Sequence, residues 1–90
     1  MPLTWPDKDP DERLDFHVDW TETLDGDAIA TSVWIVPSGI TQESASTTNN
    51  VTTIWLSGGT ANERYSLVNR ITTGGGRIFD QTIRVRVRTK

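Results

Sequence analysis

The chain has 90 residues and no cysteine, which fits one small domain without disulfide bridges or thiolate metal sites. Nine Lys and Arg against twelve Asp and Glu give a formal net charge of −3, which disfavours binding to nucleic-acid phosphates or to an anionic membrane. No apolar run approaches the roughly 20 residues of a membrane span, and the first residues lack the basic and apolar segments of a signal peptide. We therefore expect one soluble, untargeted domain.

The charges are unevenly distributed along the chain. Residues 1–45 carry a net charge of −8 and residues 46–90 a net charge of +5. The small total therefore conceals an acidic half and a basic half, which predicts contacts between surfaces of opposite charge.

Residues 1–12 are predicted to form an extended N-terminal arm. Pro2, Pro6 and Pro10 each fix φ and lack a donor, which excludes a regular helix or a central strand. Trp5 is the one aromatic residue of this polar segment, and we expect it to dock on its own domain or on a neighbour.

Residues 13–90 are predicted to form a single all-β domain. Alternating apolar and polar residues and β-branched runs are bounded by Gly, Asn, Asp and Pro about every 8–12 residues, and no helical period is present. Such spacing is typical of a β-sandwich or small barrel. The expected strands are 14–20, 29–36, a weak edge strand within 40–50 that ends in a turn at Asn49-Asn50, 51–56, 65–72 and 78–88.

The acidic residues of the arm do not predict a metal site. The run Asp7-x-Asp9-x-Asp11-Glu12 resembles the start of a calcium loop, but Glu12 occupies the place of the turning glycine. Val18 stands where the bidentate glutamate belongs. We interpret the run as a solvated acidic arm and predict no metal.

No catalytic group or cofactor is predicted. His17 lies between Asp15 and Asp19 on the polar face of a strand, but no activated serine or cysteine nucleophile accompanies it. The glycines at 58–59 and 74–76 are not followed by the Lys-Ser/Thr or the helix of a phosphate-binding loop, so we interpret them as turns.

The last strand predicts a basic stripe. Arg84, Arg86 and Arg88 alternate with valines and are joined by Lys90. Two interpretations are open: the arginines pair with Asp15 and Asp19 of the first strand, or they form a charged face for an acidic partner.

Two features resemble immunoglobulin-like domains: Trp34 on an early strand, and Tyr65-x-Leu67 after a glycine turn, which resembles a tyrosine corner. The expected fold is thus a single immunoglobulin-like β-sandwich of about six to seven antiparallel strands. A longer set of positions is similar to a family of small tailed-bacteriophage proteins labelled phage fibre-tail adaptor proteins. The matching positions are Asp9-Pro10-Asp11-Glu12-Arg13-Leu14-Asp15-Phe16, Asp19-Trp20, Gly26-Asp27, Ile29-Ala30, Ser32, Trp34, Val36-Pro37-x-Gly39, Trp55-Leu56-Ser57-Gly58-Gly59-Thr60, Tyr65, Asn69-Arg70-Ile71-Thr72-Thr73 and the closing Arg-Val-Arg segment.

This resemblance implies a non-enzymatic structural protein of the virion that links the tail to fibres or to neighbouring subunits. Its implied partners are tail adaptor, fibre or capsid subunits, and its implied location is the tail or head surface of a virion assembled in the bacterial host cytoplasm. A capsid decoration or head-fibre protein of the same phage class is an alternative. We expect several copies in a symmetric assembly, with neither nucleic acid nor membrane as a partner.

The residues themselves predict where such contacts lie. A proline-stiffened arm and an arginine stripe suit docking between subunits, and a core this thin gains stability from partners. The expected inter-subunit contacts are Trp5, Pro6, Asp7, Asp9, Arg84, Arg86 and Arg88. A second alternative is a β-sandwich carbohydrate-binding module in which Trp20 or Trp55 stacks on sugar rings, although both have apolar neighbours that favour core packing.

Overall fold

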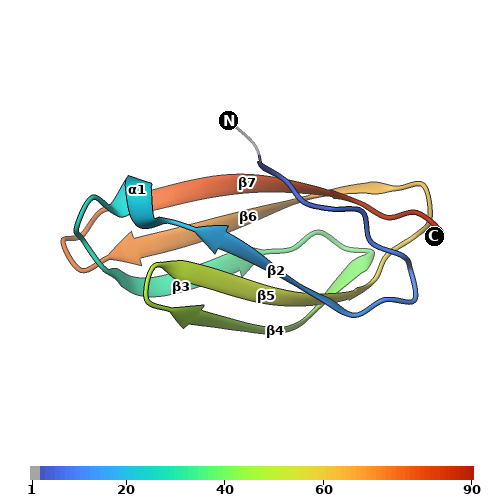
Figure 1. Ribbon diagram of the computed structural model, residues 1–90, viewed down its shortest axis with the longest axis horizontal. Helices are drawn as coiled ribbons and strands as arrows, with labels where there is room; N and C mark the ends of the chain where they lie inside the picture. The colour runs from blue at the N-terminus through green and yellow to red at the C-terminus, as the bar shows by residue number, and fades with distance from the viewer. Residues whose placement is uncertain (1–2) are drawn as a thin grey trace.

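A computed structural model describes residues 3–90 as two β-sheets packed face to face (Figure 1). One sheet has four strands in the order β1-β7-β6-β3, and the other has three in the order β2-β5-β4. The elements are β1 (Leu3–Thr4), β2 (Leu14–Asp19), α1 (Thr21–Leu24), β3 (Ile29–Ile35), β4 (Ile40–Thr48), β5 (Val51–Gly58), β6 (Arg64–Thr73) and β7 (Ile78–Arg86). The predicted all-β, immunoglobulin-like sandwich is confirmed.

Strand pairing is antiparallel except at one edge. β6 pairs with β7 and with β3, and β5 pairs with β2 and with β4, all antiparallel. The two-residue β1 runs parallel to β7, with Leu3 beside Ile83. The arm therefore supplies an edge strand that the sequence did not predict.

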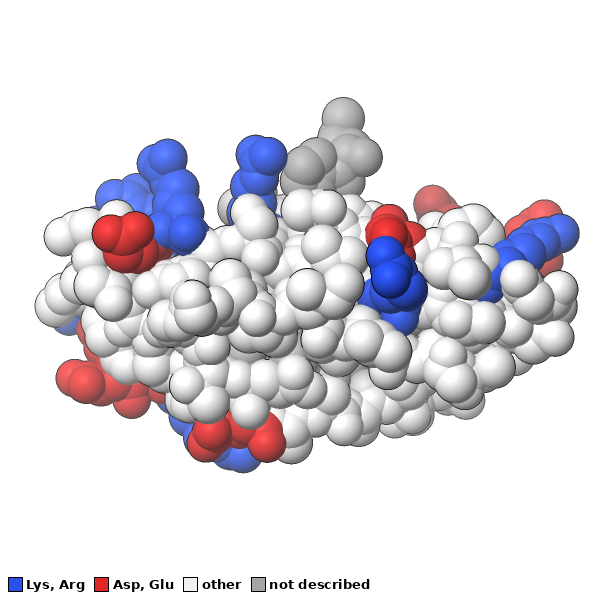
Figure 2. All heavy atoms as spheres, turned by 180° about the vertical axis from the view of Figure 1, so that it is seen from behind, with Lys and Arg blue, Asp and Glu red and all other residues white. Residues whose placement is uncertain are grey.

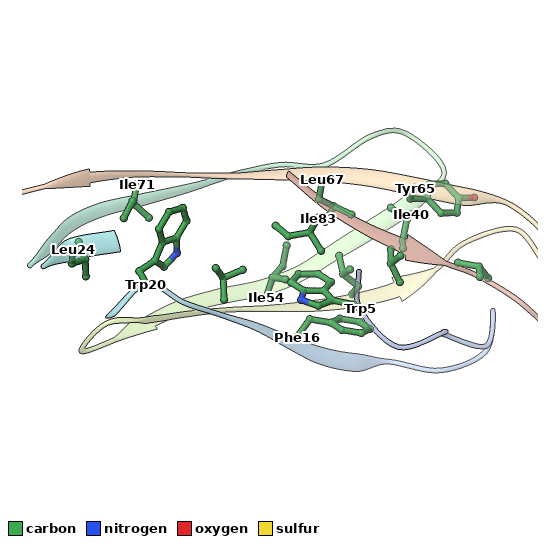
Figure 3. Close-up of a cluster of buried hydrophobic side chains, with 14 residues drawn as sticks. Trp5, Phe16, Trp20, Leu24, Ile40, Ile54, Tyr65, Leu67, Ile71 and Ile83 are labelled. Carbon is green, nitrogen blue, oxygen red and sulfur yellow. The ribbon is translucent and has the colours of Figure 1, made fainter. Parts of the chain in front are cut away.

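The core lies between the sheets because apolar residues alternate along the strands. Side chains from both sheets and from the arm meet in one cluster, and Figure 3 shows Trp5 lying against Phe16 beneath the strands of the other sheet. The ring centroids of these two residues are 4.6 Å apart in a stacked arrangement. The buried apolar residues are Trp5, Phe16, Val18, Trp20, Leu24, Ile40, Ile54, Leu56, Tyr65, Leu67, Ile71, Ile83, Val85 and Val87.

A buried polar network joins the two sheets. Asn69 of β6 accepts hydrogen bonds from the Trp20 indole (3.0 Å) and from the Thr52 hydroxyl (2.6 Å). Its amide nitrogen donates to the Ser32 hydroxyl (2.9 Å) and to the Val33 carbonyl (3.2 Å). Because burial of an unpaired amide would be costly, this full set of partners allows Asn69 to occupy the core.

Two local details support the immunoglobulin-like fold. The Tyr65 hydroxyl accepts a hydrogen bond from the Thr60 backbone N–H at 2.9 Å, as the predicted tyrosine corner requires. Gly59 has a φ of +97°, and a Cβ added there would lie 2.7 Å from a methyl carbon of Val87. A glycine at this turn therefore serves both backbone conformation and close packing.

Between β2 and β3, the structure contains a helical turn that the sequence did not predict. Asp19 accepts hydrogen bonds from the backbone N–H (3.0 Å) and hydroxyl (2.6 Å) of Thr21, which starts the turn. Asp25 ends it with a left-handed φ of 47°. The turn α1 buries Leu24 at the end of the core, and this tertiary contact outweighs the absence of a helical repeat.

The N-terminal arm lies on the sandwich. Trp5 is 8% exposed and Lys8 is fully buried, and the backbone N–H of Lys8 donates to the Arg86 carbonyl at 3.0 Å. The Lys8 ammonium donates to the carbonyls of Gly58 (2.7 Å) and Asp9 (2.9 Å). That residues 13–90 fold without residues 1–12 stays a prediction. Pro2, one of the three prolines expected to stiffen the arm, lies outside the described residues.

Candidate functional site

Three arginines without an ion-pair partner lie on the outer side of the four-stranded sheet, where Arg70 also lies but pairs with Asp80. On β7, Ile83 and Val85 point into the core, so Arg84 and Arg86 point outward. The pairing of β6 with β7 places Arg64 directly opposite Arg86. We call Arg64, Arg84 and Arg86 the arginine face.

The arginine face has no ion-pair partner within residues 3–90. Other arginines are paired: Arg70 with Asp80 at 2.8 Å, and Arg88 with Asp7 at 3.5 Å. Figure 2 shows basic side chains projecting near one end of the upper edge of the molecule, where β7 lies in Figure 1. Like charges directly opposite each other on a sheet destabilise it, so an anionic partner would relieve the repulsion between Arg64 and Arg86.

A hollow of about 270 Å³ lies in this surface. It is lined by the three residues of the arginine face together with Thr4, Asp7 and Val85. Thr4 is placed there by the pairing of β1 with β7, where it lies beside Arg84. Asp7 lies on the same hollow but forms its ion pair with Arg88. The arm thus forms one wall of the basic hollow.

Of the two interpretations of the arginine stripe, the pairing with Asp15 and Asp19 is wrong. Both aspartates belong to β2 in the other sheet, where Asp15 contacts His17 and Asp19 accepts hydrogen bonds from Thr21. Alternation within each strand could not reveal this, because it does not specify which strands share a sheet.

The predicted contact residues are distributed over two environments. Trp5 is in the core, so it docks on its own domain, the first of the two possibilities left open by the sequence. Pro6 is exposed, and Asp7 and Asp9 are half-buried. Asp7 lies with Arg84 and Arg86 on the basic hollow, whereas Asp9 accepts a hydrogen bond from the Lys90 backbone N–H at 2.9 Å.

The acidic residues of the arm are hydrogen-bonded within the domain. Backbone N–H groups of Lys90 and Asp11 donate to Asp9 and lower the pKa of its carboxyl group. The Lys90 side chain and the Asp9 N–H do the same for the pKa of Glu12. Desolvation lowers the pKa of the Lys8 ammonium. These interactions hold the arm in place.

No metal site appears in the described residues. Within residues 3–90 no group of three or more His, Asp or Glu side chains converges as metal ligands would. The ring nitrogens of His17 lie 2.8 Å from the Thr53 hydroxyl and 3.1 Å from an Asp15 carboxylate oxygen, on an exposed strand surface. The only helix in the same range is α1, which is far too short to cross a membrane.

The core packing expected for both tryptophans of the carbohydrate-binding hypothesis is found for Trp20 and is wrong for Trp55. Trp20 is 3% exposed and its indole nitrogen is hydrogen-bonded in the core. Trp55 lies half-buried on the outer side of the three-stranded sheet, with the Arg13 guanidinium 4.7 Å from its ring centre.

Sequence reasoning missed Arg64 as a member of the basic surface. A signal was present, since Arg64 precedes the inward-pointing Tyr65 and must therefore point outward. Its position opposite Arg86 depends on the register of β6 against β7, which no local pattern fixes.

The described residues therefore define an immunoglobulin-like β-sandwich with an unpaired basic surface. A similar fold is found in the solution structure of the PKD domain from KIAA 1837 protein, with a TM-score of 0.59 and 19% identity over 96% of this chain and 83% of that chain. No curated protein matches the sequence. A family model described as podophage GP4 fiber-tail adaptor protein gp77 matches residues 8–86, and the chain belongs to this family.

Proposed function

We propose that the protein is a non-enzymatic structural adaptor of a tailed-phage virion, which connects the tail to fibres or to neighbouring subunits. The observation that most directly supports this role is the arginine face, whose three exposed guanidinium groups have no acidic partner within residues 3–90. Membership of a family described as fiber-tail adaptors supports the role. The acidic partner is proposed to be a virion protein rather than nucleic acid, in keeping with the net charge of −3.

The arginine face is proposed to receive carboxylates of that partner. Arginine forms two parallel hydrogen bonds to a carboxylate, and guanidinium groups on adjacent strands present several such forks at fixed spacing. Pro6, Asp7 and Arg88 lie at or near the margin of this surface and complete the proposed contact, while Asp9 positions the arm. Trp5 contributes by holding the arm on the core rather than by direct contact.

The proposal is tested with Arg84→Gln/Arg86→Gln, which removes two positive charges and keeps polar side chains. Arg77→Gln is the control because Arg77 is also exposed but lies in the turn between β6 and β7. Each variant would be supplied to a phage that lacks this gene, and its amount in purified particles measured by quantitative mass spectrometry.

We expect at least a tenfold loss of the double variant from particles and no loss of the control, since each desolvated charge-assisted contact is worth about 1.5–3 kcal/mol. Circular dichroism and thermal unfolding check that both variants fold. Normal incorporation of a folded double variant would overturn the proposed contact.

A further inference from the structure

Strand β4 is the most exposed of the longer strands within residues 3–90. It is nine residues long and forms the edge of the three-stranded sheet, yet only Ile40 is buried. Residues 41–48 are exposed whichever side of the sheet they face. In Figure 1, β4 lies at the lower margin of the sandwich with no strand beyond it. One row of its backbone N–H and C=O groups therefore has no neighbouring strand.

The other sheet edges differ from β4, although β1 covers only Ile83 and Arg84 of β7 and leaves residues 78–82 without a strand on that side. β1 has only two residues, and the Trp5 indole nitrogen donates to the His17 carbonyl of β2 at 3.2 Å. β3 has an irregular register between Ile29 and Thr31, and the Asn69 amide donates to its Val33 carbonyl. Natural proteins use short strands, bulges and covered backbone groups in this way to prevent pairing with other chains.

The second half of β4 lacks each of these features. Its register shift lies between Gln42 and Ser44, and from Ser44 to Thr48 the pairing with β5 is regular. No lysine or proline interrupts the strand. A hollow of about 720 Å³ lies beside its C-terminal end, lined by residues 28–32, Thr47, Asn49 and Asn50. This free edge therefore has both the backbone groups and the space for another strand.

We infer that the free edge of β4, residues 44–48, pairs antiparallel with the same edge of a second copy of this chain. The strand Ser44-Ala45-Ser46-Thr47-Thr48 is small and uncharged on both sides, so it fits against itself. A two-fold axis at Ser46 brings the two Ser46 residues opposite each other and joins the three-stranded sheets into one of six strands.

The only charge on β4 is compatible with this pairing. Glu43 lies three residues from the axis and already contacts Arg13 of its own chain at 3.6 Å. In the antiparallel pair the two Glu43 residues are six positions apart along the sheet, about 20 Å at 3.4 Å per residue. This separation exceeds the Debye length of about 8–10 Å at physiological salt, so repulsion between the glutamates is screened.

The inference concerns the purified protein and does not depend on the proposed virion role. A single strand edge is smaller than standard interfaces, so we expect a weak dimer with a Kd of about 0.1–1 mM. Sedimentation equilibrium over a concentration series that spans this range would detect it.

Charge variants at the axis identify the interface. Ser46→Lys and Ser46→Glu each place like charges directly opposite in a homodimer, so each variant alone should lose self-association at least tenfold. An equimolar mixture of the two should associate more strongly than the wild type. Ser38→Lys and Ser38→Glu are matched controls in the exposed turn before β4 and should self-associate as the wild type does.

A second measurement uses the absence of native cysteine. Ser46→Cys should form an intermolecular disulfide with oxidised glutathione far faster than Ser38→Cys, because opposed strand residues have Cβ atoms about 4.5–5.5 Å apart. Circular dichroism checks that every variant folds. The inference is overturned if the wild type remains monomeric across the concentration series, or if a dimer forms that neither Ser46 charge variant weakens. A monomeric wild type would mean that any strand pairing at this edge involves a different protein.

Discussion

The N-terminal segment and strand β4 have opposite relations to the core. Residues 3–12 are mostly irregular in backbone structure, yet Trp5 lies buried in the apolar cluster and the Lys8 side chain is fully buried. β4 is a regular nine-residue strand, yet Ile40 is its only buried residue. Regular backbone hydrogen bonding therefore does not indicate which segment holds the domain together, because the buried side chains decide that.

The difference follows from what each segment offers to the core. The arm contributes the large aromatic ring of Trp5 and the long aliphatic stem of Lys8. The Trp5 indole N–H donates to the His17 carbonyl, and the Lys8 ammonium donates to the carbonyls of Gly58 and Asp9. From Thr41 to Thr48, β4 has only small or polar side chains. It is held by its ladder with β5 and remains available for contacts outside the chain.

The largest expected effect is that of Trp5→Ala. The substitution removes a ring stacked on Phe16 and tilted 6.0 Å from Trp34, and it leaves the His17 carbonyl without its indole donor. We expect a loss of about 3–5 kcal/mol in the free energy of unfolding, measured by urea denaturation. Leu3→Ala, at a position 40% exposed, should cost less than about 1 kcal/mol. Equal losses for the two would show that the ring does not anchor the arm.

Lys8→Met is expected to have the next largest effect. Methionine retains most of the aliphatic stem but cannot donate to the Gly58 and Asp9 carbonyls, so two acceptors lose their donor. We expect a loss of about 1–3 kcal/mol in the same denaturation assay. The control is Lys90→Met, whose exposed ion pair with Glu12 should be worth less than about 1 kcal/mol. A neutral or stabilising Lys8→Met would show that desolvation of the ammonium offsets both hydrogen bonds.

Acid should loosen the arm. The pKa values of Asp9 and Glu12 are lower in the folded protein than their ordinary values of 3.8 and 4.5, because Lys90 and nearby backbone N–H groups bind the charged forms. Their contribution to stability is therefore present above these ordinary values and lost as the pH falls through the lower folded values.

Thermal unfolding at a series of pH values from about 7 to about 2 would measure this effect. Asp9→Asn/Glu12→Gln should unfold at a lower temperature than the wild type at neutral pH and should flatten the decline at acid pH. Glu43→Gln on β4, with one exposed contact to Arg13, is the matched control. An unchanged acid decline in the double variant would exclude these carboxylates as its cause.

Most of the fold could be predicted from local patterns, and the misses arose from long-range contacts. The strand alternation of Ile83, Val85 and their neighbours located β7, and the turn residues Asn49 and Asn50 located the end of β4. The parallel pairing of Leu3 with Ile83 and the burial of Lys8 depend on contacts about 80 residues apart, which local propensity does not encode.

For the candidate site, too, local patterns predicted which way side chains point, but not which residues lie side by side. Alternation correctly placed Arg84 and Arg86 on an outer face, but their neighbour Arg64 and the remote position of Asp15 followed only from the order of strands in the two sheets. The side chain of a strand residue can be assigned to a face from sequence, whereas the residues beside it require the register.

The smallest expected effects are those of exposed residues on β4. Thr41→Ala and Ser46→Ala remove side chains that contact mainly solvent, so each should change the free energy of unfolding by less than about 0.5 kcal/mol. Ile40→Ala provides the contrast within the same strand, because Ile40 is 5% exposed and its truncation should cost about 2–5 kcal/mol. The measurements require dilute protein, at which strand pairing between copies does not contribute. If Ser46→Ala proved as costly as Ile40→Ala under those conditions, the exposed half of β4 would be supporting the monomer, and the contrast between this strand and the arm would not hold.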